Sequence, residues 1–197
     1  MEQEEKQLDE KEALQLIANM IRSTKDSLSD NSFYMLLWGW LVFIATTSFF
    51  ILMKMQVSYA AAVWLLMPLG AVVTIIYTWK KHRRERAKSY IGQIISYLWI
   101  ALGVGMFVVL GFQQQLQLAT YPMMMTLYGI GLFVTGGAIR FRPVIIAGVL
   151  CWGFAIGAMF TSFENQTLIL AACVFTCYII PGHMLRRKET MYAVSGA

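Results

Sequence analysis

The sequence predicts an all-α integral membrane bundle of six transmembrane helices, preceded by an amphipathic helix in the cytoplasm. Three observations lead to this fold class. The chain is 58% hydrophobic and only 14% charged, whereas a soluble domain carries roughly 25% charged residues. Its apolar residues form long continuous stretches. Its basic residues gather in alternate connections between those stretches, as the loops of a membrane protein do.

Six stretches are long enough to cross a bilayer, which takes about 20 mainly apolar residues in a helix. They are residues 33–53, 57–79, 90–112, 121–139, 143–160 and 167–185, and no Asp, Glu, Lys or Arg lies inside them. A transmembrane β-barrel would instead show alternating segments of about ten residues. Because the apolar runs are continuous, we expect helices.

Residues 1–32 differ from the rest of the chain. Eight acidic and four basic residues lie among the first thirty. Asp9 and Glu12 have the spacing of a capping box, and the apolar residues that follow recur at helical intervals. We therefore expect an amphipathic helix from Glu10 to about Leu28, followed by a polar hinge. Its apolar stripe comprises Leu14, Ile17, Ile21 and Leu28.

The distribution of basic residues predicts the orientation. Of the 16 Lys and Arg residues, Lys54 alone falls in the first, third and fifth connections. The others lie in the N-terminal segment, the second and fourth connections and the C-terminal tail. Since short basic loops stay on the inner side, we expect both termini in the cytoplasm. The domains are then 1–32, the six-helix bundle 33–185 and a basic cytoplasmic tail 186–197.

The second connection, residues 80–88, is strongly basic. One interpretation is a topology determinant that also contacts anionic lipid. The other is a docking surface for the acidic N-terminal helix, which the topology places on the same side. A nucleic-acid site is not expected, because the loop has no aromatic residue on which a base could stack. The basic residues are Lys80, Lys81, Arg83, Arg84, Arg86 and Lys88.

The first two helical hairpins resemble each other in sequence. A shift of 61 residues aligns eight identical positions, among them Trp38 with Trp99 and Gly70 with Gly131. Both hairpins start on the inner side, so a duplication would give a parallel repeat. In the fifth span, Gly153 and Gly157 form a G-x-x-x-G pattern. Small residues let two helices approach closely in a membrane, and we expect them to pack within the bundle or against a second copy of the chain.

Residues 131–152, with Gly131, Gly136, Arg140, Pro143 and Trp152, resemble a pattern in small, uncharacterised, multi-spanning bacterial inner-membrane proteins. Those proteins also carry an acidic N-terminal helix before their spans. The resemblance implies a bacterial inner membrane as the location and implies no activity. Independently of it, Pro143 suits the first turn of a helix.

Little in the sequence points to chemistry. No catalytic or phosphate-binding motif is present, so we expect no enzyme, and no cofactor is predicted. Charged residues are absent from the spans, which argues against ion-coupled transport. Cys173 and Cys177 share a helix face, and soft thiolate ligands suit Cu(I). Buried thiols are normally inert, however, and we expect neither a metal site nor a disulfide framework.

These observations favour a non-enzymatic interaction or regulatory subunit anchored in the cell inner membrane. Its expected partners are the lipid bilayer and a cytoplasmic protein that recognises the acidic helix. A second copy of the chain is an alternative partner. The alternative function is a small permease or a subunit of a membrane transporter.

Overall fold

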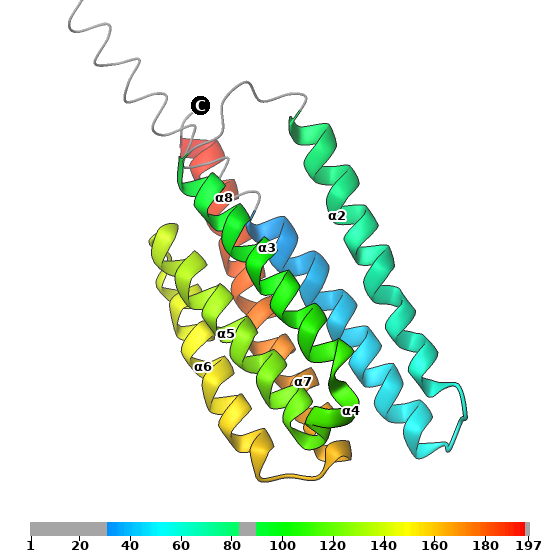
Figure 1. Cartoon of the computed structure of the whole chain (residues 1–197). Helices are drawn as coiled ribbons and strands as arrows, with labels where there is room; N and C mark the ends of the chain where they lie inside the picture. The colour runs from blue at the N-terminus through cyan, green and yellow to red at the C-terminus, as the bar shows by residue number, and fades with distance from the viewer. Residues whose placement is uncertain (1–30, 83–89, 196–197) are drawn as a thin grey trace, which may run out of the picture.

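All six apolar stretches form helices that are long and apolar enough to cross a membrane, so the predicted fold class is confirmed (Figure 1). The computed structural model describes residues 31–82 and 90–195. The first described helix is Asn31–Lys54, which we call the first helix. It is followed by η1 (Ala60–Leu65), α2 (Leu66–His82), α3 (Tyr90–Gly111), α4 (Gln113–Leu116), η2 (Gln117–Ala119), α5 (Thr120–Ala138), α6 (Arg142–Met159), α7 (Phe163–Val174), η3 (Phe175–Ile179) and α8 (Ile180–Ser195).

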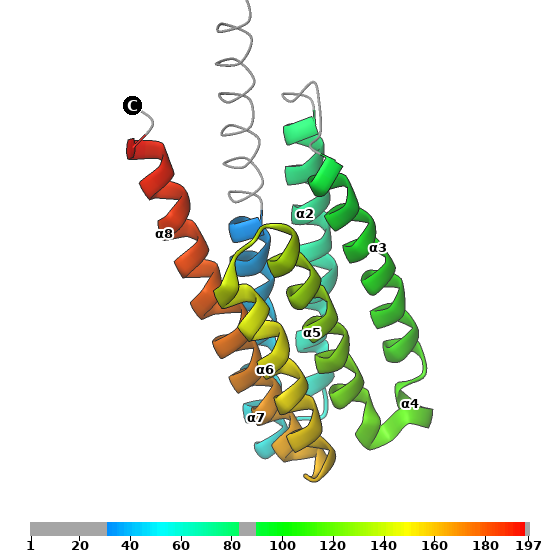
Figure 2. The ribbon, with the colours of Figure 1, turned by 90° about the vertical axis from the view of Figure 1, so that its left-hand side faces the viewer.

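The helices run up and down, so that the connections alternate between two ends of the bundle (Figures 1 and 2). We call the end that carries Asn31, Lys80, Arg140 and the C-terminus the basic end. Lys54, α4 and the α6–α7 turn lie at the other end, which we call the opposite end. This arrangement matches the predicted alternation of basic and non-basic connections.

Two predicted connections are more helical than expected. Residues 113–119, which we expected to form a loop, form the short helices α4 and η2. The last span continues as α8 to Ser195, so residues 186–195 form a helix where we expected a tail. Figure 2 shows α8 extending past the neighbouring helices at the basic end.

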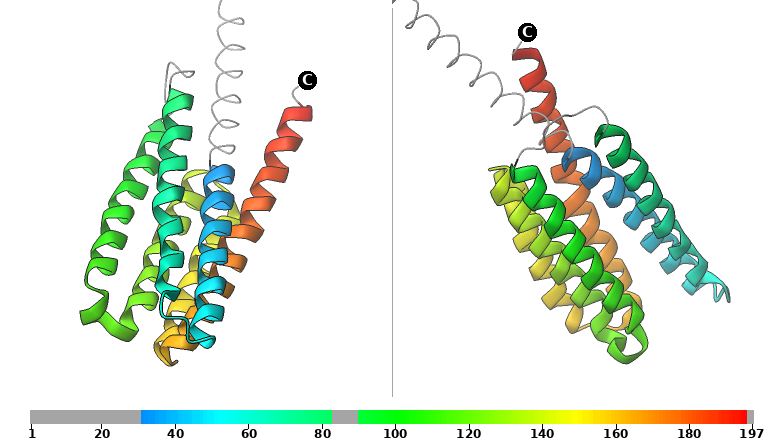
Figure 3. Two further views of the ribbon diagram at one scale, coloured as in Figure 1. Left: turned by 90° about the vertical axis from the view of Figure 1, so that its right-hand side faces the viewer. Right: turned by 45° about the horizontal axis from the view of Figure 1, so that its top comes forward.

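The buried core lies between the first helix, α5, α6 and the continuous segment formed by α7, η3 and α8. α2 and α3 lie toward the outside of the bundle (Figure 3). Only 11% of the most apolar part of α2 and 17% of that of α3 are buried, against 56% in the last span. In a membrane, the outer faces of α2 and α3 are therefore the ones that meet lipid or another protein.

α5 and α6 approach each other so closely that backbone touches backbone. A Cβ atom on Gly148 would lie 2.7 Å from the backbone nitrogen of Phe133 and 2.9 Å from the carbonyl oxygen of Gly129. A Cβ on Gly136 would lie 2.6 Å from the nitrogen of Ile145. Neither α5 nor α6 has room for a side chain at these points, so glycine makes the contact sterically feasible.

The turn between α5 and α6 is a Schellman motif. The N–H of Phe141 donates to the carbonyl of Gly136 at 2.9 Å, and that of Arg140 donates to the carbonyl of Gly137 at 3.1 Å. Arg140 has φ 51°, a left-handed conformation that usually belongs to glycine in this motif. A non-glycine residue there costs roughly 1–2 kcal/mol. Arginine instead of glycine keeps a positive charge at the basic end.

The two hairpins that resemble each other in sequence also share their internal packing. In the first, a Cβ on Gly70 would lie 2.7 Å from Leu41 and 3.6 Å from the ring of Trp38. In the second, a Cβ on Gly131 would lie 2.8 Å from Leu102 and 3.0 Å from the ring of Trp99, which are the same contacts 61 residues later. The turns correspond as well, since the aligned residues Gln56 and Gln117 have φ of 55° and 46°. These coincidences support a duplication of the hairpin.

Candidate functional site

Three cysteine side chains meet in the core. Cys151 comes from α6, Cys173 from α7 and Cys177 from η3, and all three are fully buried. Their Sγ atoms all lie within 4.8 Å of one another. The thiol of Cys173 points at the Sγ of Cys151, 3.5 Å away. We call this group the thiol cluster.

The α6–α7 hairpin explains why residues far apart in sequence meet. Cys151 precedes the turn around Phe160–Ser162 by about as many residues as Cys173 follows it, so the two face each other across the antiparallel pair. Cys177 joins them because residues four apart lie on the same side of a helix. This equal distance from the turn was a signal in the sequence, but we considered only the Cys173–Cys177 pair and missed Cys151.

Cys177 lies in an irregular turn. η3 is a π-helix, in which the N–H of Ile180 donates to the carbonyl of Phe175. Pro181 follows directly. Proline cannot donate to the carbonyl four residues earlier, which is that of Cys177, and its ring crowds that carbonyl. A wider turn relieves this conflict, and single π-turns of this kind often occur at functional sites.

Two tyrosines lie beside the thiol cluster. Tyr128 from α5 and Tyr178 from η3 contact each other edge to face, with ring centroids 5.6 Å apart. The hydroxyl of Tyr178 belongs to the residue that directly follows Cys177 in the chain. It is buried and has no hydrogen-bond partner among the residues that the structure describes. Buried polar groups normally have such a partner, so the unpaired hydroxyl of Tyr178 is an exception to that rule.

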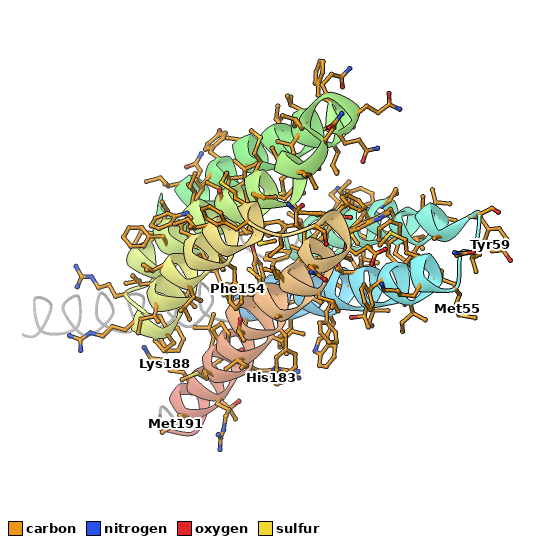
Figure 4. All side chains as sticks on the ribbon, turned by 90° about the horizontal axis from the view of Figure 1, so that it is seen from below. Met55, Tyr59, Phe154, His183, Lys188 and Met191 are labelled. Carbon is orange, nitrogen blue, oxygen red and sulfur yellow. The ribbon has the colours of Figure 1, made fainter. Side chains whose placement is uncertain are left out.

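The basic end forms a second candidate site, where three segments converge. Ser32, at the start of the first helix, donates to the carboxylate of Glu189 on α8 at 3.3 Å. The ammonium group of Lys188 lies 5.0 Å from the ring centroid of Phe141, in the α5–α6 turn. Figure 4 shows Lys188 and Met191 toward the free end of α8, and Met55 and Tyr59 at the opposite end of the molecule.

The first helix and α8 also pack closely below this contact. A Cβ on Gly182 would lie 3.0 Å from Leu36 and 3.4 Å from Met35. The start of the first helix is therefore held against the base of the α8 extension. His183, the histidine at the start of that extension, bonds through Nδ1 to the carbonyl of Ile179 at 2.8 Å, so this ring nitrogen is already used.

At the opposite end, polar side chains link the connections to one another through an ion pair and hydrogen bonds. Lys54 and Glu164 form an ion pair between exposed side chains. Gln166 is fully buried, and its Nε2 donates to the carbonyl of Leu118 at 2.9 Å and to that of Ala158 at 3.0 Å. These bonds join α7 to η2 and to the end of α6.

Several predicted site residues lie outside the described part of the chain. They are the stripe Leu14, Ile17, Ile21 and Leu28, and the loop residues Arg83, Arg84, Arg86 and Lys88. Of the basic loop, the side chain of Lys80 is described and is exposed. The docking of the acidic helix against this loop therefore stays a prediction.

The predicted packing of Gly153 and Gly157 within the bundle is not found in the described residues. A Cβ on either glycine would meet nothing within 4 Å. Both glycines instead line an open apolar groove on α6, together with Leu150, Phe154 and Ile169. The residues that do bring α6 close to its neighbour are on its other face, around Gly148. The alternative, contact with a second copy of the chain, stays a prediction.

The fold and the composition together define a multi-pass α-helical membrane protein with an apolar core that contains a thiol cluster. No family model, curated protein or solved structure matches the chain. The function must therefore be inferred from the chain itself.

Proposed function

We propose that this chain is a non-catalytic interaction or regulatory subunit of the cell inner membrane, and that it presents its N-terminal segment to a cytoplasmic protein. The contact between Ser32 and Glu189 carries the proposal. It holds the exit of the acidic segment beside the helical extension of α8, which bears Arg186, Arg187 and Lys188. A partner at this end would meet the predicted acidic helix together with the basic extension of α8.

The hydroxyl groups in the spans support a structural role for the bundle. Ser96, Thr126 and Thr176 each donate to the carbonyl four residues earlier, at 2.8 Å. Hydroxyls bonded in this way are satisfied within their own helix and do not offer a polar lining. In the described residues, the formally charged side chains lie at the ends of the spans.

One observation favours the alternative, a transport component. The hydroxyls of Thr46 and Thr47 on the first helix and of Thr74 on α2 are buried without a hydrogen-bond partner in the described part of the chain. Water could supply those partners if a path opened beside these helices. Uptake of small solutes by liposomes that contain the protein would favour this alternative over the interaction subunit.

The orientation is testable by labelling. With both termini in the cytoplasm, a cysteine placed at Gln115 should react with an impermeant thiol reagent added from outside, whereas one at Arg84 should not. Because Cys151, Cys173 and Cys177 are buried, the unmodified protein provides the background. Labelling at Arg84 together with protection at Gln115 would reverse the topology.

The partner is testable by purification in mild detergent. We expect a cytoplasmic protein to copurify with the full chain and to be lost when Ile17 and Ile21 are replaced by serine, because burial of each contributes roughly 1.5–3 kcal/mol. Replacing Gln15 and Asn19 by serine is the matched control, since these residues lie on the opposite face of the predicted helix. Equal recovery from both double variants would exclude the stripe as the binding surface.

A further inference from the structure

We propose that the thiol cluster is a binding site for a trivalent thiophilic metalloid, arsenic(III) being the member of this class to test first. Cys151, Cys173 and Cys177 would supply one sulfur each. This role is independent of the proposed interaction at the basic end, because the cluster lies in the core and takes a ligand of different chemistry.

The distances suit one central atom bound by three sulfurs. Bonds from a thiolate to a metal are about 2.3 Å long, so three sulfurs around one centre are roughly 3.3–4.0 Å apart. In the described cluster, one pair is 3.5 Å apart and all three sulfurs lie within 4.8 Å. Binding would draw the third sulfur toward the other two.

The surroundings decide which kind of ligand fits. The three cysteines are fully buried members of the hydrophobic core, and an uncompensated charge in such a place costs several kcal/mol. With three thiolates, Cu(I) would leave two negative charges and Zn(II) would leave one. A trivalent centre leaves none. The apolar core therefore selects a trivalent ligand over the commoner thiophilic cations.

The binding reaction is neutral throughout. Arsenous acid is uncharged and exchanges its three hydroxyl groups for three thiolates: As(OH)₃ + 3 RSH → As(SR)₃ + 3 H₂O. Each thiol proton leaves in a water molecule with one hydroxyl of the acid. Arsenic stays in the +3 state and sulfur is not oxidised, so the step needs no further reactant.

The unpartnered hydroxyl of Tyr178 is a second observation that favours an occupant. It is buried and has no hydrogen-bond partner among the described residues, the neighbouring thiols included. An occupied cluster is one way for this buried hydroxyl to gain the partner that the described residues lack. The π-helix of η3 contributes as well, because it sets the position of Cys177 relative to Cys173.

The test uses the full chain, reduced and held in mild detergent, with arsenite as the probe. After removal of free arsenite, elemental analysis should give one arsenic per chain. X-ray absorption at the arsenic edge should show three sulfur neighbours at about 2.3 Å. Fewer than three sulfur neighbours, or no retained arsenic, would overturn the proposal. So would stoichiometric Cu(I) binding by a protein that does not retain arsenite.

Single substitutions test whether arsenite binds at the thiol cluster. Cys151→Ala should weaken arsenite binding by at least about tenfold and leave two sulfur neighbours. Thr176→Val is the matched control, because its hydroxyl lies 3.6 Å from the Sγ of Cys177 and its loss removes no thiol. Binding unchanged by Cys151→Ala would contradict the proposal. If that variant fails to fold, the sulfur count in the unmodified protein still decides the question.

Discussion

Replacing Gly148 by leucine is expected to destabilise the bundle by about 3 kcal/mol, the upper end of the usual cost of overpacking. The new side chain would meet the backbone of Phe133 and Gly129 on α5. Backbone atoms in a helix cannot turn aside as a flexible side chain can, so α5 and α6 would have to separate. Unfolding in mixed micelles with increasing denaturing detergent measures this loss.

Gly153→Leu is the matched control for that experiment. It places the same side chain on the same helix, five residues later, where a Cβ meets open space. We expect a change within about 0.5 kcal/mol, as for other exposed positions. Equal destabilisation by the two variants would show that a leucine side chain anywhere on α6 is disruptive, and that the close approach of α5 and α6 is not the cause.

Replacing Gln166 by leucine is expected to cost about 2 kcal/mol, because it removes two hydrogen bonds to backbone carbonyls, each worth about 1 kcal/mol. Those carbonyls belong to Leu118 and Ala158, and the bonds that they accept fasten η2 and the end of α6 to α7. Besides the loss of stability, we expect faster proteolysis within residues 113–119. Limited proteolysis and detergent unfolding together measure both effects.

Gln115 provides the comparison within the same end of the molecule. It is exposed, so Gln115→Leu should change the free energy of unfolding by no more than about 0.5 kcal/mol. If Gln166→Leu is equally harmless, the side chain of Gln166 does not hold this end together.

The six spans were predictable because a bilayer imposes a simple rule of length and apolarity. The fifth span shows this well, since we predicted 143–160 and α6 is Arg142–Met159. The extension of the last helix to Ser195 was not predictable in this way. Beyond Leu185 that helix is polar, and hydropathy detects apolar residues, not helical backbone.

The contacts between helices were much less predictable. A G-x-x-x-G motif marks a face on which helices can approach, but it does not say whether a neighbour lies there, as Gly153 and Gly157 show. The glycines that do make the contact, Gly129, Gly136 and Gly148, form no short motif. Two members of the thiol cluster, Cys173 and Cys177, could be paired from the sequence because they share one helix face. The third, Cys151, could be added only once the register between α6 and α7 was known.

The repeated hairpin has a consequence for how the protein is assembled. On α5, the positions that touch α6 include Gly129 and Gly136. The positions 61 residues earlier on α2 are Pro68 and Ile75, both exposed. The packing inside each hairpin is the same, but the two hairpins meet the rest of the bundle through different members. The second uses α5, whereas the first uses its first helix, where Gly39 lies against Tyr178 and Ile179. Each hairpin is thus completed by a helix that is synthesised later: the second by α6, which follows it directly, and the first by the last span, at the far end of the chain.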